Sequence, residues 1–331
     1  MTAEKKVQTW YVTFLRKAVP IAVSAGIIYY YFRGMEWERI IAETSRANLG
    51  LAVAAVALPQ FIFWYFETLI VHKHFTWFHK PFPWREYFWV RGAIYILMFV
   101  NVALGGGGIV YYIKRKAEIS WKKLGGIMLF RFGLTMWGLT PFLIVATALM
   151  HYYGVVDEGS VALYIWWGVL VFGFLWMIEG WLVWNRDRNF GLAKYLVRDR
   201  QSEFWTAFRL AGNREWWLTW AMTLPPFFLM LVGVWLLALA FGIEVPFVRF
   251  IALAPLFWLV MDLPIAFAGF GTATMSWNLF FGSYGTEADV AALTLFLPFA
   301  RSATRAVIGA ISLKPALNEI KVLSGDEEKG S

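Results

Sequence analysis

The sequence predicts an all-α polytopic membrane protein. It has about six apolar runs long enough for transmembrane helices and two broken segments that are expected to re-enter the membrane. Three observations support this fold class. Of the 331 residues, 60% are hydrophobic and only 16% are charged, whereas a soluble domain carries about 25% charged residues. Six apolar runs approach the ~20 residues that a helix needs to cross a bilayer. Two further apolar regions are interrupted by glycine or proline.

The six predicted spans are 14–32, 49–71, 124–150, 161–184, 216–241 and 286–310. The interrupted regions are 88–112 and 250–282. The first run follows basic residues, as in a signal peptide, but lacks an evident small-residue cleavage site, so we expect an uncleaved anchor. Residues 324–331 are polar and are predicted to be a disordered tail. Cysteine is absent, which excludes disulfides and thiolate metal sites.

The distribution of lysine and arginine predicts the topology, because these residues favour the cytoplasmic side of short loops. Most of them fall in segments 1–17, 72–91, 113–123, 185–215 and 311–331. These five segments can share one side only if 88–112 and 250–282 each return to the side from which they started. Both termini are then expected in the cytoplasm, with the protein in the inner membrane.

This topology divides the membrane region into two halves, 1–150 and 151–323. Each half has the order span, span, re-entrant segment, span, so the second half is predicted to be inverted relative to the first. In secondary transporters, paired interrupted segments at corresponding positions of two halves indicate the binding site. Irregular backbone at membrane depth must be buried in protein or line a wet cavity, because lipid cannot satisfy its hydrogen bonds.

The two broken segments contain the candidate site residues. In "NVALGGGG", Asn101 precedes a run of four glycines, Gly105 to Gly108, which permits positive φ and close approach of the backbone to another group. Tight helix contact through small residues is the alternative. In "MDLPIAFAGFG", Pro264 removes a backbone donor and Gly269 and Gly271 follow. A simple proline-kinked span is the alternative there.

These patches resemble the flippase-like transmembrane family named after the membrane region of lysylphosphatidylglycerol synthase. The matching residues are Asn101, Gly105, Gly108, Arg131, Pro264, Ile265, Gly269, Gly271 and Arg301. The resemblance implies translocation of lipids or lipid-linked molecules between leaflets. Because no aminoacyl-transfer domain follows, synthase activity is not expected.

The sequence also departs from the family pattern at three positions. Members usually have a proline in the first turn and an acidic residue directly after it, where this chain has Gly105 and Ile109. They also have a glutamate after the second motif, where this chain has Thr274. If the carboxylates bind a headgroup in relatives, this protein handles its cargo differently.

Three arginines outside the basic segments, Arg131, Arg301 and Arg305, lie within predicted spans, where a charge at the helix centre costs at least ~2.5 kcal/mol on insertion scales. Arg131 either extends toward the cytoplasm or contacts a phosphate, and Arg301 either contacts a phosphate or pairs with a buried acid. Asp262, Glu67 and Glu179 are the acids that could pair with them. Asp262 could instead cap a helix, and Glu67 and Glu179 are expected in solvated interfacial positions.

The favoured function is therefore that of a transporter-like lipid flippase, whose cargo is a phospholipid or polyprenyl phosphate. Its predicted substrate-binding residues are Asn101, Gly105, Gly108, Arg131, Asp262, Pro264, Gly269, Gly271, Thr274 and Arg301. No cofactor, metal or nucleic acid is expected. An enzyme is disfavoured because no clustered carboxylates or activated nucleophile are evident; a membrane-embedded lipid transferase is thus the weakest alternative. A non-catalytic scaffold or assembly factor for an envelope or lipid pathway remains the main one, and a membrane-protein partner or homo-oligomer fits either role.

Overall fold

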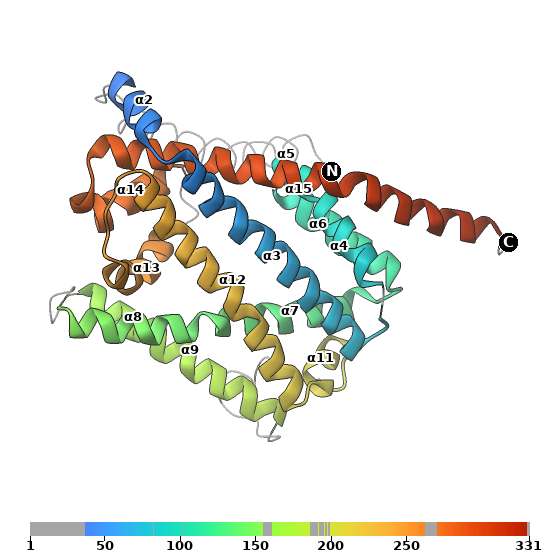
Figure 1. Cartoon of the computed structure of the whole chain (residues 1–331). Coiled ribbons are helices and arrows are strands. Elements are labelled where there is room, and N and C mark those ends of the chain that lie inside the picture. Colours follow the sequence, from blue (N-terminus) through green and yellow to red (C-terminus); the bar gives the residue numbers. More distant parts are fainter. Residues whose placement is uncertain are drawn as a thin grey trace, which may run out of the picture. The chain divides into compact units, whose positions relative to one another are not determined.

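The computed structural model describes residues 37–329, with gaps at 82, 101, 155–160, 186–190, 192–194, 196, 198 and 262–269. Within these residues every regular element is helical, as the sequence predicts (Figure 1). The predicted span 14–32 lies outside the described residues. So do four of the candidate site residues, namely Asn101, Asp262, Pro264 and Gly269.

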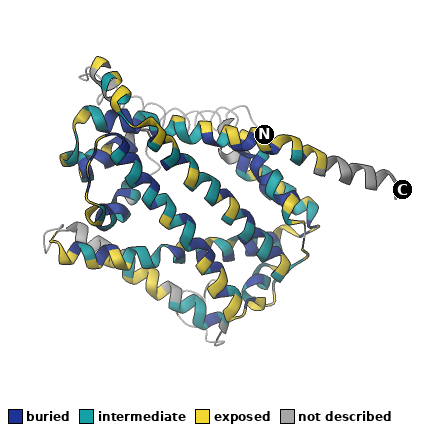
Figure 2. Cartoon of the chain, in the orientation of Figure 1, coloured by how far each residue is buried: buried dark blue, intermediate teal, exposed yellow. Residues whose placement is uncertain are grey.

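Among the described residues, four helical stretches are long and apolar enough to cross a membrane: Leu49–Phe78, Trp121–Tyr152, Asn213–Ala240 and Glu287–Asn318. They correspond to the predicted spans 49–71, 124–150, 216–241 and 286–310. They comprise α3 (Leu49–Phe78), α7 (Trp121–Gly138) with α8 (Thr140–Tyr152), α12 (Asn213–Ala240), and most of α15 (Glu287–Lys329). In the most apolar window of each, only 22% to 39% of the residues are buried (Figure 2). Such exposed apolar surface requires lipid, and the chain is an integral membrane protein.

The predicted span 161–184 coincides with α9 (Val161–Asn185). Large apolar side chains on α9, including Trp167, Phe172 and Leu175, are exposed. The apolar stretch found there, Leu170–Trp184, is shorter than a full crossing. The count of six spans therefore stays a prediction.

Both interrupted regions form helical hairpins. The first comprises α4 (Trp84–Ala93), α5 (Tyr95–Val100) and α6 (Val102–Lys116). A Cβ on Gly105 would lie 3.1 Å from the backbone nitrogen of Met98. Positions seven residues apart in a continuous helix are separated by about 10 Å along its axis, so the chain reverses between α5 and α6.

The second interrupted region contains α13 (Phe247–Met261) and α14 (Phe270–Phe281). Phe250 contacts Phe281 at 5.2 Å between ring centroids, and Phe257 contacts Trp277 at 5.1 Å. This order of contacts shows that α14 runs back along α13.

The glycine run corrects one prediction. Gly105 to Gly108 lie inside α6 and do not form an irregular turn. Positive-φ glycines among the described residues are Gly154, Gly191 and Gly242. Small-residue contact is the right interpretation at Gly105, where α5 packs against the helix. At Gly106 and Gly107 an added Cβ would have no atom within 4 Å, so no neighbour requires a glycine at these two positions. All four glycines lie in a continuous helix, which satisfies its backbone hydrogen bonds internally.

The chain divides into two compact units. Unit 1 contains residues 1–55, 146–155 and 234–300, and unit 2 contains residues 56–145, 156–233 and 301–331. The predicted halves 1–150 and 151–323 concern membrane topology and stay a prediction. α15 extends through most of the C-terminal segment to Lys329.

Unit 1 has an aromatic core. Phe250 and Phe257 of α13 meet Trp277 and Phe281 of α14, and all four side chains are fully buried. The short helix η3 (Gly282–Tyr284) follows, and the Tyr284 carbonyl accepts a hydrogen bond from the Glu244 amide at 3.2 Å. The amide of Asn48, in the link between α2 (Trp37–Arg46) and α3, donates to the Ala240 carbonyl at 2.9 Å. The bond between Glu244 and Tyr284 closes the open end of the α13–α14 hairpin, and the bond from Asn48 ties the start of α3 to the end of α12.

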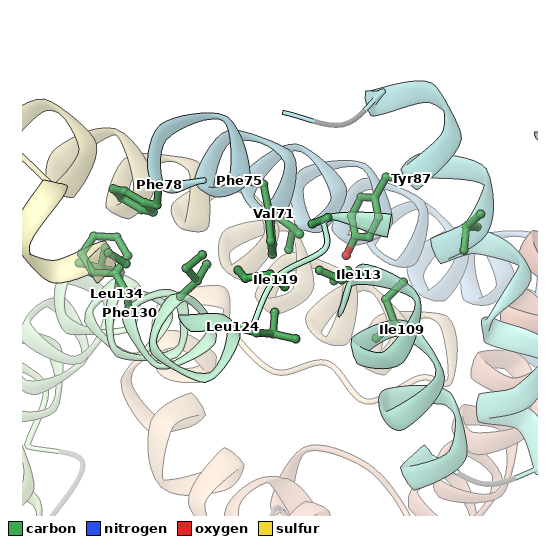
Figure 3. Packing of buried hydrophobic residues seen from close by; sticks show 14 of the residues in the cluster. Val71, Phe75, Phe78, Tyr87, Ile109, Ile113, Ile119, Leu124, Phe130 and Leu134 are labelled. Atoms are coloured by element: carbon green, nitrogen blue, oxygen red, sulfur yellow. The ribbon is translucent and has the colours of Figure 1, made fainter. Parts of the chain in front are cut away.

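Unit 2 has a larger core at the C-terminal end of α3, where side chains converge from α3, α4, α6 and α7 (Figure 3). The helix η1 (Glu203–Trp205) and α11 (Thr206–Leu210) also pack against α7. The main members of this core are Val71, Phe75, Phe78, Tyr87, Ile109, Ile113, Ile119, Leu124, Phe130, Leu134, Ala207 and Trp216.

This core brings three of the basic segments together. Lys80 pairs with Glu118 at 3.3 Å, and the Ser120 hydroxyl donates to Glu203 at 2.6 Å. Segments 72–91, 113–123 and 185–215 therefore meet at one end of unit 2. The predicted topology places these three segments on one side of the membrane, and that orientation stays a prediction.

Candidate functional site

Three charged side chains form a buried cluster in unit 2. Glu67 of α3 accepts hydrogen bonds from Arg91 of α4 and Arg131 of α7. Arg91 places Nη2 at 2.6 Å and Nε at 3.0 Å from Oε2, whereas Arg131 places Nη2 at 2.8 Å from Oε1. The side chains of Glu67, Arg91 and Arg131 are 10%, 6% and 25% exposed. One carboxylate thus faces two guanidinium groups, and the cluster carries an excess positive charge.

Arg91 is held on every side by its surroundings. Its guanidinium lies 4.8 Å from the centre of the Tyr95 ring, and its Nη1 lies 3.8 Å from the sulfur of Met98. Gln60 of α3 donates to the Tyr95 hydroxyl at 3.3 Å. Two bonds to the same carboxylate oxygen and this cation–π contact make Arg91 a fixed part of the fold.

Arg131 lines a small pocket of about 40 Å³ between α3, α7 and α12. The polar part of the pocket wall consists of Arg131, its partner Glu67, Thr135 and Thr223. The apolar part consists of Phe63, Ile70, Pro226 and Phe227. The Thr135 hydroxyl donates to the carbonyl of Arg131 at 2.9 Å, and the Thr223 hydroxyl donates to the carbonyl of Trp220 at 2.6 Å. Because both hydroxyl protons are engaged, Arg131 provides the side-chain donors of this pocket.

Two interruptions of regular helix lie beside the pocket. α7 ends at Gly138, and α8 begins at Thr140 after Leu139. α12 contains Pro225 and Pro226, which cannot donate to the carbonyls four residues before them. The indole nitrogen of Trp220 on α12 donates to the carbonyl of Trp137 at 3.1 Å and ties the two helices together here.

The remaining predicted residues are distributed over both units. Gly105 packs on Met98, and an added Cβ on Gly108 would lie 3.5 Å from Leu97. Arg301 lies half-buried on α15 in unit 2. Gly271 lies in α14, and Thr274 of the same helix is 3% exposed, both in unit 1. Of the predicted set, Arg131 lies in the charged cluster.

The departures from the family pattern have a structural context. Ile109 is 9% exposed and belongs to the apolar core of unit 2. Thr274 is likewise buried. Neither position here could accept an unpaired carboxylate without the cost of burying a charge.

Two residues of the cluster were misjudged from sequence. Glu67 was named among the acids that could pair with the span arginines, and its ion pair with Arg131 confirms that alternative. The favoured expectation of a solvated interfacial position is wrong, because two arginines from other helices enclose Glu67. Arg91 was counted with the basic loop 72–91, yet it is 5% exposed. A signal was available, since Glu67 lies inside the apolar run 49–71 and Arg91 inside the apolar region 88–112.

Comparison with known proteins agrees with the resemblance in the sequence. No curated protein and no solved structure matches the chain significantly. The sequence model described as the lysylphosphatidylglycerol synthase TM region matches residues 17–309, which is most of the chain. With its apolar spans and broken hairpins, this protein therefore belongs to the lysylphosphatidylglycerol synthase TM region family.

Proposed function

We propose that this protein is a flippase that moves a phosphate-bearing lipid between the two leaflets of a membrane, with Arg131 as the contact for the phosphate. The observation that carries the proposal is the buried cluster of two arginines on one carboxylate. Of the two arginines, Arg131 lines the pocket, together with its partner Glu67. Ionisable residues within membrane segments are costly, and they commonly mark substrate pathways.

The charge balance favours an anionic ligand. Glu67 neutralises one of the two guanidinium groups, so one positive charge remains in a largely apolar surrounding. A phosphate that approached Arg131 would compensate that charge and accept charge-assisted hydrogen bonds. A planar guanidinium suits two oxygens of one phosphate better than an ammonium would.

The two arginines differ in how freely they could engage a ligand. Arg91 donates two bonds to Glu67 and is nearly enclosed. Arg131 donates one bond to Glu67 and is the most exposed member of the cluster. A guanidinium has five N–H donors, so Arg131 keeps donors for a phosphate while Arg91 holds Glu67 in place.

The pocket at Arg131 has room for a water molecule or two but not for a headgroup, since a water needs about 10–15 Å³ of such volume. Lipid entry therefore requires α12 to move away from α3 and α7. The prolines in α12 and the break at Leu139 lie beside the pocket, where helical hydrogen bonding is already interrupted. We place the opening motion there.

Several further features belong to this proposal. Arg301 on α15 is a second contact for the phosphate in the proposed pathway. The protein lies in the inner membrane with both termini in the cytoplasm. Its cargo is a phospholipid or a polyprenyl phosphate, and no covalent chemistry is assigned to it. A homo-oligomer or a second membrane protein is compatible with this role.

The test is lipid movement in proteoliposomes with tail-labelled fluorescent phospholipids and polyprenyl phosphates, read as the fraction of probe that an impermeant reductant bleaches. Arg131→Gln is expected to slow movement about tenfold or more, the equivalent of one charge-assisted hydrogen bond. Arg131→Lys should retain part of the rate, and Arg301→Gln should also lower it. Arg249→Gln is the matched control, because Arg249 is exposed on α13 and bonds Tyr284.

Unchanged movement in folded Arg131→Gln protein would disprove the assignment of Arg131. Folded wild-type protein that moves none of the lipids would favour the scaffold alternative. The scaffold role also requires that Arg131 and Arg301 tolerate substitution in cells.

A further inference from the structure

The turn between α6 and α7 lies at the ends of two candidate membrane spans. The span Leu49–Phe78 ends next to His79, and the span Trp121–Tyr152 begins just after this turn. His79 joins them, because its Nε2 lies 2.7 Å from the Ala117 carbonyl and its Nδ1 lies 3.1 Å from Nζ of Lys123. The carbonyl can only accept, so Nε2 carries the proton and Nδ1 accepts from the lysine. Because two candidate spans end at this turn, we expect it to lie at the level of the lipid headgroups.

This turn forms an open groove of about 640 Å³, lined by Lys114, Arg115, Glu118, Ile119, Ser120 and Trp121. The ammonium of Lys114 lies 5.6 Å from the centre of the Trp121 ring. Trp121 itself is 57% exposed. Tryptophan and basic side chains together are typical of the membrane–water interface.

The carboxylates around the groove are already engaged. Glu118 pairs with Lys80 at 3.3 Å, and Glu203 accepts the Ser120 hydroxyl at 2.6 Å. Glu86 holds Lys116 at 2.8 Å on the other side of α6. Within the part of the chain that the structure describes, Lys114 and Arg115 have no carboxylate partner. The groove therefore offers two cations beside an exposed indole ring.

We propose that this groove binds the phosphate of an anionic phospholipid headgroup from the surrounding leaflet. Lys114 and Arg115 contact the phosphate, and Trp121 packs against the glycerol region of the same lipid. The bound lipid is a resident one and not the cargo, because Arg131 lies about 15 Å further along α7 from Trp121 at the helical rise. The site does not depend on translocation.

The test uses the absence of cysteine from the chain. Lys122→Cys, an exposed position beside the groove, gives a unique thiol for a fluorophore. The labelled protein is reconstituted into phosphatidylcholine vesicles that contain a nitroxide-labelled lipid, with the nitroxide high on the acyl chain. Nitroxide phosphatidylglycerol is expected to quench the fluorophore more strongly than nitroxide phosphatidylcholine at equal mole fraction.

The preference for phosphatidylglycerol should fall about fivefold for each groove cation removed, the usual contribution of one basic residue near an anionic surface. Lys114→Gln/Arg115→Gln should therefore abolish it. Lys314→Gln is the matched control, since Lys314 is an exposed lysine on α15, and it should leave the preference unchanged. Near-ultraviolet circular dichroism verifies that each variant is folded.

Equal quenching by the two lipids would overturn the proposal, as would a preference that survives the double substitution. Inorganic phosphate added to the aqueous phase separates the two sources of phosphate. Relief of quenching by phosphate at constant ionic strength would identify a site for free phosphate and contradict a lipid site. None of these results depends on whether the protein moves lipid across the bilayer.

Discussion

Glu67→Gln is expected to be the most destabilising single substitution in the charged cluster. The substitution leaves Arg91 and Arg131 buried near each other without a counter-charge, and it weakens the three hydrogen bonds that the carboxylate accepts. Breaking a buried ion pair by removing one partner costs about 3–5 kcal/mol. The free energy of unfolding should fall by about that amount.

Arg131→Gln should cost less. It removes one hydrogen bond and leaves Glu67 neutralised by Arg91, so the loss is about 1.5–3 kcal/mol, toward the lower end because a quarter of the Arg131 side chain is exposed. The double variant Glu67→Gln/Arg131→Gln retains one unpaired arginine in place of two. Its cost should be smaller than the sum of the two single costs by about 0.5–3 kcal/mol.

Equilibrium unfolding in mixed micelles with increasing sodium dodecyl sulfate, followed by circular dichroism, measures these differences. Glu244→Gln serves as the control, because Glu244 lies exposed before α13. A cost for Glu67→Gln no larger than that for Arg131→Gln would refute the charge argument. Strict additivity in the double variant would refute the direct pairing.

Further predictions concern glycines at helix contacts. Gly92→Ala should lower the free energy of unfolding by about 1–3 kcal/mol. The added Cβ would lie 2.7 Å from both Trp64 Cζ2 and Ser312 Cβ, and both of these side chains are buried. Thermal unfolding measures this cost, and Gly92→Ala with Ser312→Gly should recover part of it; an unchanged midpoint would contradict the contact of α4 with α15. Gly105→Ala should destabilise the protein, whereas Gly107→Ala, with open space at its Cβ, should stabilise α6 by about 0.5–1 kcal/mol; the same shift for both in unfolding experiments would contradict the packing of α5 on α6.

The sequence determines the spans because lipid imposes one simple condition. A backbone in hydrocarbon must satisfy its own hydrogen bonds, so a long apolar run there becomes a helix. Four predicted spans accordingly match helices of the structure. The distribution of lysine and arginine predicted that 88–112 and 250–282 would turn back, and both regions contain paired helices that form hairpins.

The local form of the first hairpin could not be predicted from the glycines. Glycine permits a left-handed turn and equally permits close helix contact. Met98 decides between the two at Gly105, since its backbone lies against the position where a Cβ would project. That contact depends on where α5 lies, which no local pattern contains.

The charged cluster shows the same division. The sequence establishes that Arg131 lies within an apolar run, and that it needs a partner or a route to water. It cannot show that Glu67, 64 residues earlier, is that partner, or that Arg91 shares the same carboxylate. Such pairs form when three helices pack together. The sequence by itself thus determined membrane insertion and the family, because both depend on composition and local motifs, and only the tertiary structure decided which charges meet, because that depends on the packing of distant helices.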